Sequence, residues 1–147
     1  MSLTDEQLAR IDFLLYECED DATFAETLLR IESSAELHAL AQQINWDGGF
    51  DELNAVLEHP LCDRGTALMV YWLGEPTYFA DFASDDDVPP VNQPLKQFLN
   101  RVENQLMTEH FKSNTICFDP MADLNVVQRR KIENIASIPS ALKRPNC

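Results

Sequence analysis

His59, Cys62 and Asp63 lie within five residues of one another near the middle of the chain, and they are the residue types best suited to chemistry. A cysteine beside a histidine and a helix N-terminus is a candidate nucleophile, because both neighbours stabilise the thiolate. However, Pro60 intervenes, no third group that would orient His59 is evident, and most free cysteines pack as small hydrophobic side chains. The pattern therefore favours a structural Cys62, with a thiol-dependent enzyme that uses Cys62 as an alternative.

The same corner of the sequence offers too few ligands for a metal ion. Structural zinc sites usually hold four ligands at recognisable spacings. The cysteines are far apart and form no C-x-x-C pair: Cys18, Cys62, Cys117 and Cys147. His38 and His110 have no histidine or cysteine three or four residues away. We expect no metal, no cofactor, and thiols that stay free in a reducing cytoplasm, while pairing of Cys117 or Cys147 outside the cell stays open.

Acidic residues form two dense clusters, and aromatic residues precede the second. The carboxylates around Gly48-Gly49 are accounted for by turn and cap chemistry, so we assign no catalytic residue. Aromatic side chains flanked by acids suit a protein-binding surface, with burial in the core as the alternative for Tyr78 and Phe79. The residues predicted to contact a partner are Glu17, Glu19, Asp20, Asp21, Tyr78, Phe79, Asp85, Asp86 and Asp87. The two clusters form one acidic face only if the fold brings them together.

The charge is strongly negative and unevenly distributed. Asp and Glu total 25 against 11 Lys and Arg, a net charge of −14. Residues 1–95 carry 20 acids and 3 bases (−17), whereas residues 96–147 carry 5 acids and 8 bases (+3). Such an acidic protein repels phosphate backbones, so we expect no nucleic-acid partner. It attracts a basic protein and speeds their encounter, although acidity also serves solubility alone.

Short helices must position these residues. Apolar residues recur at three- and four-residue spacings, and capping boxes at Thr4-x-x-Gln7 and Ser33-x-x-Glu36 mark two helix starts. Residues 66–73 are apolar nearly all round, which predicts a buried helix, with a buried strand as the alternative. The fold class is thus mostly α, a compact bundle of about six to eight short helices. We expect helices over about residues 5–17, 22–31, 34–44, 51–58, 66–73, 77–83, 94–112 and 124–136.

Three other segments are expected outside the helices. Residues 84–94 contain three aspartates and tandem prolines and predict a surface loop, residues 115–118 favour a short extended segment, and residues 140–147 are expected to fray. The length suits a single domain over residues 1–147. No apolar run reaches the roughly 20 residues that span a bilayer, and the N-terminus lacks a signal-peptide pattern. We therefore expect a cytoplasmic protein without a membrane partner.

A longer pattern runs through the middle of the chain: Trp46-Asp47-x-Gly49-Phe50, then His59-Pro60-x-Cys62-Asp63-x-Gly65-Thr66-Ala67-Leu68, then Trp72-Leu73. This pattern resembles that of a small bacterial domain family of unknown function, over about residues 37–111, and leaves residues 113–147 as a C-terminal extension. The resemblance implies a compact helical domain and brings no known activity and no catalytic residues. Some members resemble the small proteins that are encoded beside bacterial toxins.

These observations lead to one main hypothesis and two alternatives. The acidic front portion, the lack of a catalytic set and the resemblance together predict a non-enzymatic immunity protein, which occludes a cognate, basic bacterial toxin. A regulatory or structural adaptor without a toxin is the first alternative. The thiol-dependent enzyme that uses Cys62 is the second.

Overall fold

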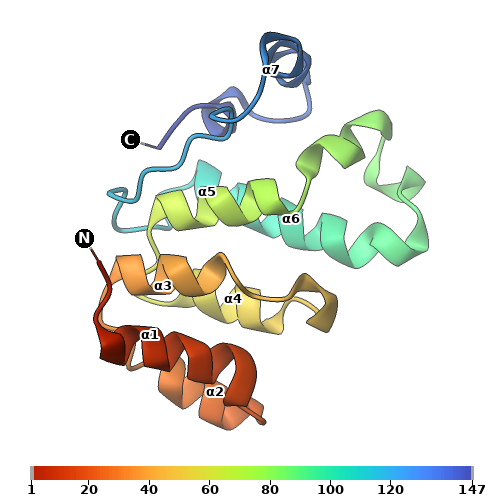
Figure 1. Ribbon diagram of the computed structural model, residues 1–147. Coiled ribbons are helices and arrows are strands. Elements are labelled where there is room, and N and C mark those ends of the chain that lie inside the picture. The colour runs from red at the N-terminus through yellow and green to blue at the C-terminus, as the bar shows by residue number, and fades with distance from the viewer. Residues whose placement is uncertain (1, 147) are drawn as a thin grey trace.

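The computed structural model describes residues 2–146, and in these residues short helices follow one another with brief connections (Figure 1). The described residues form seven α-helices: α1 (Asp5–Asp12), α2 (Asp21–Leu28), α3 (Ser34–Ala41), α4 (Asp51–Glu58), α5 (Arg64–Leu73), α6 (Gln93–Met107) and α7 (Val126–Glu133). One-turn helices lie between and after them: η1 (Phe13–Glu17), η2 (Trp46–Gly48), η3 (Pro76–Asp81), η4 (Asp85–Asp87), η5 (Pro90–Asn92) and η6 (Ser140–Lys143). The predicted mostly-α bundle of six to eight short helices is confirmed.

The helices are stacked along the molecule in chain order. In Figure 1, α1 and α2 form the lower end, α3 and α4 lie above them, α5 and α6 follow, and α7 forms the upper end. Helix α5 lies at the centre and is buried from Gly65 to Tyr71, as its apolar sequence predicts. Its neighbours α3, α4 and α6 supply most of the other fully buried side chains, among them Leu37, Leu40, Leu53 and Val102.

The N-terminal helices are fixed by caps and by one buried ion pair. Thr4 and Gln7 form the predicted capping box of α1. At α3 only half of the predicted box exists: Ser33 caps the Glu36 N–H, but the Glu36 carboxylate turns away and accepts from Arg10 Nε at 2.6 Å. Glu36 is fully buried, and Arg10 also bonds to Glu32 at 2.9 Å. A buried carboxylate needs such partners, so this pair ties α1 to α3.

The C-terminal segment is ordered through its last described residues. Residues 115–118 form no strand, and Phe118 alone forms an isolated antiparallel bridge with Asn146. The prediction that residues 140–147 fray is wrong for residues 140–146. There the Leu142 side chain is fully buried and its carbonyl accepts from the Trp72 indole N–H at 2.8 Å. Cys147 lies outside the described residues.

The predicted surface loop at residues 84–94 is structured by hydrogen bonds. It consists of η4 and η5, and the Gln93 side-chain amide donates to the carbonyls of Asp85 (2.6 Å) and Val88 (2.8 Å). Val88 is buried, so the loop is anchored on the body of the bundle.

Candidate functional site

Asp63 is a structural acceptor at the start of α5. Its carboxylate is fully buried and accepts from the backbone N–H groups of Gly65 (2.8 Å), Thr115 (2.7 Å) and Ile116 (3.1 Å), and from the Ser113 hydroxyl (2.8 Å). Burial opposes ionisation, but these hydrogen bonds outweigh it and hold the pKa of Asp63 below its usual value. Asp63 therefore caps α5 and also binds the returning C-terminal segment.

The neighbouring backbone allows this segment to come close. A side chain on Gly65 would collide with the Ile116 carbonyl, so the contact requires glycine. The Arg64 N–H donates to the Ser113 carbonyl at 2.9 Å, and its guanidinium donates to Asn146 Oδ1 at 3.1 Å. Asn146 in turn donates to the Ile116 carbonyl at 2.7 Å.

The histidines near this corner also have structural partners. His59 is buried, its Nε2 lies 2.9 Å from the Leu28 carbonyl, and the Leu61 N–H donates to its Nδ1 at 3.0 Å. His59 is therefore the neutral tautomer protonated at Nε2, with both ring nitrogens used. His38 Nδ1 lies 2.9 Å from the hydroxyl of buried Thr66, and burial lowers the pKa of His38.

Cys62 lacks the properties of a nucleophile. Its side chain is 3% exposed, and burial together with the Asp63 and Glu58 carboxylates raises the pKa of the Cys62 thiol to about 12. The thiolate is thus disfavoured at neutral pH. A nearby helix N-terminus alone would have the opposite effect, because it lowers the pKa of a thiol. Cys18 and Cys62 are free, as predicted, but that prediction is wrong for Cys117, which is disulfide-bonded.

The first acidic cluster forms an exposed corner between η1 and α2. Its four carboxylates are exposed, and Asp20 also caps α2 by accepting from the Thr23 N–H at 2.7 Å, which lowers the pKa of Asp20. Tyr16, which sequence analysis did not single out, is 76% exposed beside them. Its position depends on the π-helical turn η1, a feature that no sequence signal marked. We call Tyr16, Glu17, Glu19, Asp20 and Asp21 the acidic corner.

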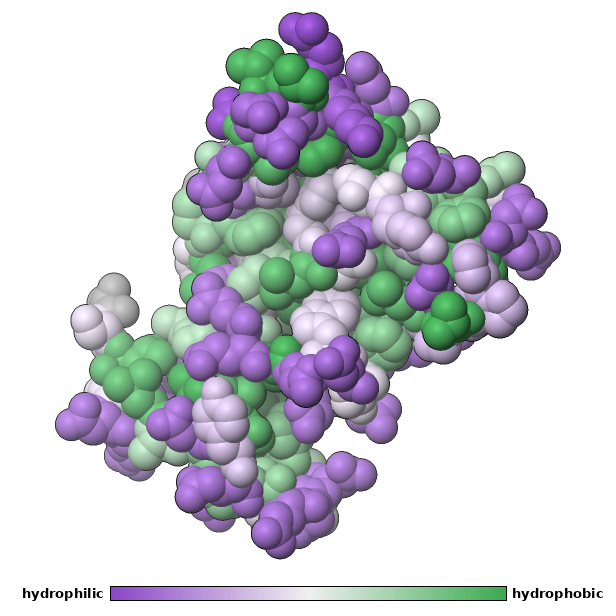
Figure 2. Space-filling view, turned by 45° about the vertical axis from the view of Figure 1, so that its right-hand side comes forward, coloured by the Kyte–Doolittle hydropathy of each residue, from purple (hydrophilic) through white to green (hydrophobic). Residues whose placement is uncertain are grey.

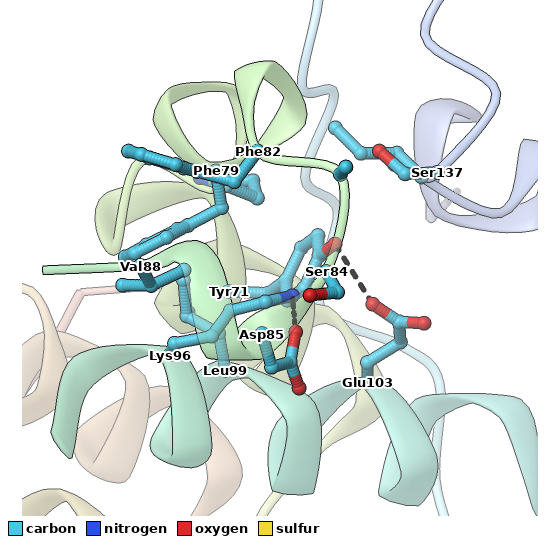
Figure 3. A pocket seen from close by; sticks show the side chains of 13 residues that line it. Tyr71, Phe79, Phe82, Ser84, Asp85, Val88, Lys96, Leu99, Glu103 and Ser137 are labelled. Carbon is cyan, nitrogen blue, oxygen red and sulfur yellow. Dashed lines mark hydrogen bonds and ion pairs between the residues drawn. The ribbon is translucent and has the colours of Figure 1, made fainter. Parts of the chain in front are cut away.

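The second acidic cluster is partly neutralised within the molecule. Asp85 accepts from the Asn100 side chain at 2.9 Å and lies 3.7 Å from Lys96 Nζ, so its carboxylate is already paired (Figure 3). Asp86 and Asp87 are exposed, and only Asp87 has a side-chain hydrogen bond, from the Ser84 hydroxyl at 3.4 Å. Two of the three predicted aspartates therefore remain available to a partner.

A small pocket of about 130 Å³ lies behind this cluster. Figure 3 shows the Tyr71 hydroxyl pointing to Glu103, to which it donates at 3.2 Å. Burial and the Glu103 charge raise the pKa of Tyr71. Phe79 also lines this pocket and is buried, with Lys96 Nζ 5.7 Å from its ring centre. The alternative of core burial therefore applies to Phe79, and we remove it from the partner surface.

The two acidic clusters do not form one face. The acidic corner lies at the lower end of the molecule, the Asp85–Asp87 turn lies beside α6, and α3 and α4 lie between them in Figure 1. Figure 2 shows hydrophilic side chains crowding the lower and upper ends, whereas the middle is paler. Tyr78 is 43% exposed on η3 and accepts from the Asn92 side chain at 2.9 Å. The molecule therefore presents two separate acidic surfaces.

Residues 2–146 contain neither a cluster of metal ligands nor a membrane-spanning helix. No three His, Cys, Asp or Glu side chains in this range converge on a position that could hold a metal ion. None of the helices described there is both long and apolar enough to cross a membrane.

Comparison with known proteins identifies the family of the central helices. The family described as "Domain of unknown function (DUF4274)" matches residues 32–107. The chain belongs to this family. No curated protein and no solved structure matches the chain.

The DUF4274 region contains only part of the candidate sites. It begins ahead of α3 and ends with α6, close to the boundaries expected from the sequence pattern. Asp63 lies inside it, but the donors at residues 113–116 lie outside, and so does the acidic corner. In this chain, the N-terminal helices and the C-terminal segment therefore pack on the DUF4274 helices.

Proposed function

We propose that this DUF4274 protein binds another protein and contacts it first through the acidic corner. The more specific proposal is an immunity protein that neutralises a cognate, basic bacterial toxin by occluding its active site. The proposal keeps the cytoplasmic location, the non-enzymatic role and the lack of a nucleic-acid or membrane partner expected from the sequence.

One observation carries the proposal: an exposed aromatic side chain lies among four exposed carboxylates. Tyr16 is 76% exposed, and tyrosine is a residue type that is enriched in protein interfaces. The carboxylates around it belong to a region of −17 net charge, which attracts a basic partner and accelerates association. The groups in the middle of the molecule that could do chemistry are instead buried and hydrogen-bonded, as Asp63, His59 and Cys62 are.

The test is a pull-down with the tagged full chain from its native host, eluted with rising salt. We expect one basic partner in near-stoichiometric amount, released by salt because exposed charge pairs are screened. The charge-reversal variant Glu17→Lys/Glu19→Lys leaves the cap residue Asp20 intact and should weaken binding about 10-fold or more.

The matched control is Glu109→Lys/Asp123→Lys, which changes the net charge equally at exposed positions in the C-terminal third. If both variants lose affinity equally, only overall charge matters and the acidic corner is not the contact surface. Unchanged affinity in both variants would contradict the electrostatic basis of the proposal.

Inhibition separates the immunity protein from an adaptor. A partner that is encoded next door and loses a toxic activity when bound supports immunity, whereas a bound partner with unaltered activity supports the adaptor. The redox state of Cys117 in the cell tests the location, because structural disulfides are rare in a reducing cytoplasm. Thiol trapping followed by mass spectrometry measures it.

A further inference from the structure

A groove lies between η3 and α7, at the opposite end of the molecule from the acidic corner (Figure 1). It has a volume of about 560 Å³, within the range of about 300–1,000 Å³ that binding pockets occupy. From this groove we infer that the protein has a second binding site, for a peptide segment in which a basic residue adjoins aliphatic residues. This goes beyond the proposed function, because the site needs neither the acidic corner nor a toxin.

The apolar stripe formed by α7 and its flanks is only partly covered. Ile132 lies in α7, Leu124 and Ile135 flank its two ends, and none of the three is buried. Ile135 packs against the core, but no residue of α7 itself is buried. Eight-residue helices are marginal in water, and most helices gain their stability by packing an apolar face. The stripe therefore leaves apolar surface open toward the groove.

The helix is held at its two ends instead. Asn125 and Gln128 form a complete capping box at its start. After its last turn, buried Lys143 donates to the carbonyls of Glu133 (3.2 Å) and Ile135 (2.8 Å). These bonds fix α7 across from η3 without filling the space between them, so the groove is built into the fold.

Negative charge on the η3 side of the groove favours an occupant with a cationic side chain. Glu75 and Asp81 line this wall and are exposed, and neither carboxylate has a hydrogen bond or an ion pair within residues 2–146. Glu75 has left-handed backbone (φ 57°), the single non-glycine residue of the described chain with positive φ. Such conformations are strained and cluster at functional sites, including ligand clamps. Two unpaired carboxylates on one wall favour a cationic side chain.

The other surfaces of the groove complete the specificity. Ile132 and Ile135 offer an aliphatic floor, and the ring of Tyr78 adds an apolar edge with a polar tip. Lys131 lies on the α7 wall, where it repels a second cation and suits an acceptor such as a peptide carbonyl. The occupant thus places one Arg or Lys against η3 and aliphatic side chains against α7.

The test uses nuclear magnetic resonance of the full chain with methyl-labelled Ile and Leu. The probe is acetyl-Gly-Arg-Ile-Val-Gly-amide, and acetyl-Gly-Glu-Ile-Val-Gly-amide is the matched control. We expect saturable shifts of the Leu124, Ile132 and Ile135 methyls with the arginine peptide, and binding at least about 5-fold weaker for the glutamate peptide.

Two variants assign the binding to the groove. Glu75→Gln/Asp81→Asn should weaken the arginine peptide about 5–10-fold, because two carboxylate contacts are lost. The control Glu52→Gln/Glu109→Gln removes equal charge at exposed positions outside the groove and should leave binding unchanged.

Several results would overturn the inference. They are the lack of saturable shifts up to about 5 mM of either peptide, shifts centred elsewhere, and equal binding by the two peptides or by the two variants. In a sample that also carries methyl-labelled Ala, direct contacts between the Ile132 and Ala80 methyls in the free protein would show that α7 closes on η3 by itself, and would equally overturn it.

Discussion

The start of α5 and the groove beside α7 use the same kinds of residues in opposite ways. At the start of α5, the buried carboxylate of Asp63 accepts from three backbone N–H groups and from the hydroxyls of Ser113 and Thr115. At the groove, the exposed carboxylates of Glu75 and Asp81 have no partner within residues 2–146, and the apolar stripe of α7 is only partly covered.

The difference separates groups that hold the fold together from groups that remain available. A buried polar group without partners costs about 1–3 kcal/mol, so the fold satisfies Asp63 completely. Solvated carboxylates carry no such cost and keep their charge for another molecule. The region of His59, Cys62 and Asp63 is therefore structural, and the surfaces available to another molecule lie at the two ends of the protein.

The largest expected effect is the loss of Asp63. Asp63→Ala leaves five donors from Gly65 and residues 113–116 without their acceptor and should lower the free energy of unfolding by about 3–5 kcal/mol. Urea unfolding followed by circular dichroism measures this loss. Asp86→Ala, at an exposed aspartate, is the control and should change stability by less than about 0.5 kcal/mol. A loss below about 1 kcal/mol for Asp63→Ala would show that the corner is not structural.

Cys62 reactivity provides the next test. With its thiol pKa at about 12 and its side chain buried, Cys62 should react with iodoacetamide at neutral pH at least about 100-fold more slowly than an unfolded cysteine. Peptide mass spectrometry after timed alkylation of the folded and the urea-unfolded chain gives both rates. Rapid alkylation of folded Cys62 would instead support the alternative hypothesis of a thiol-dependent enzyme.

The pH dependence of stability sharpens the comparison further. The pKa of Asp63 is lowered in the fold, so its stabilising contribution is present above the ordinary aspartate pKa of about 3.9 and is lost as pH falls through the folded pKa. The stability difference between the wild type and Asp63→Asn should therefore shrink as pH falls from about 5 to about 3. Urea unfolding of both proteins at each pH measures this difference. A constant difference would mean that Asp63 is not ionised in the fold.

The smallest effect is expected at α7. Val127→Thr replaces a side chain that is 76% exposed and should change the free energy of unfolding by less than about 0.5 kcal/mol. The same substitution at fully buried Val70 in α5 places a hydroxyl in the core and should cost about 1–3 kcal/mol. Equal costs at the two sites, measured by urea unfolding, would show that Val127 is covered in solution.

Local signals in the sequence determined where several helices begin. Thr4, Ser33 and Asp63 each cap the helix that the sequence places after them. The apolar residues from Ala67 to Val70 predict the buried centre of α5. These signals act within one or two turns of the chain, so they can be read without knowing the path of the rest.

Only the tertiary structure decided what these residues contact. The donors to Asp63 come from residues 113–116, about fifty positions further along the chain, where no local pattern announces them. The burial of Phe79, the anchoring of the last residues by Trp72 and the groove beside α7 likewise depend on distant segments. The sequence by itself determined the helices and the acidic charge, because propensity, capping and composition are local. The path of the chain decided which carboxylates are hydrogen-bonded within the fold and which remain exposed to solvent. The reason is that a buried group takes its partners from whatever segment passes beside it.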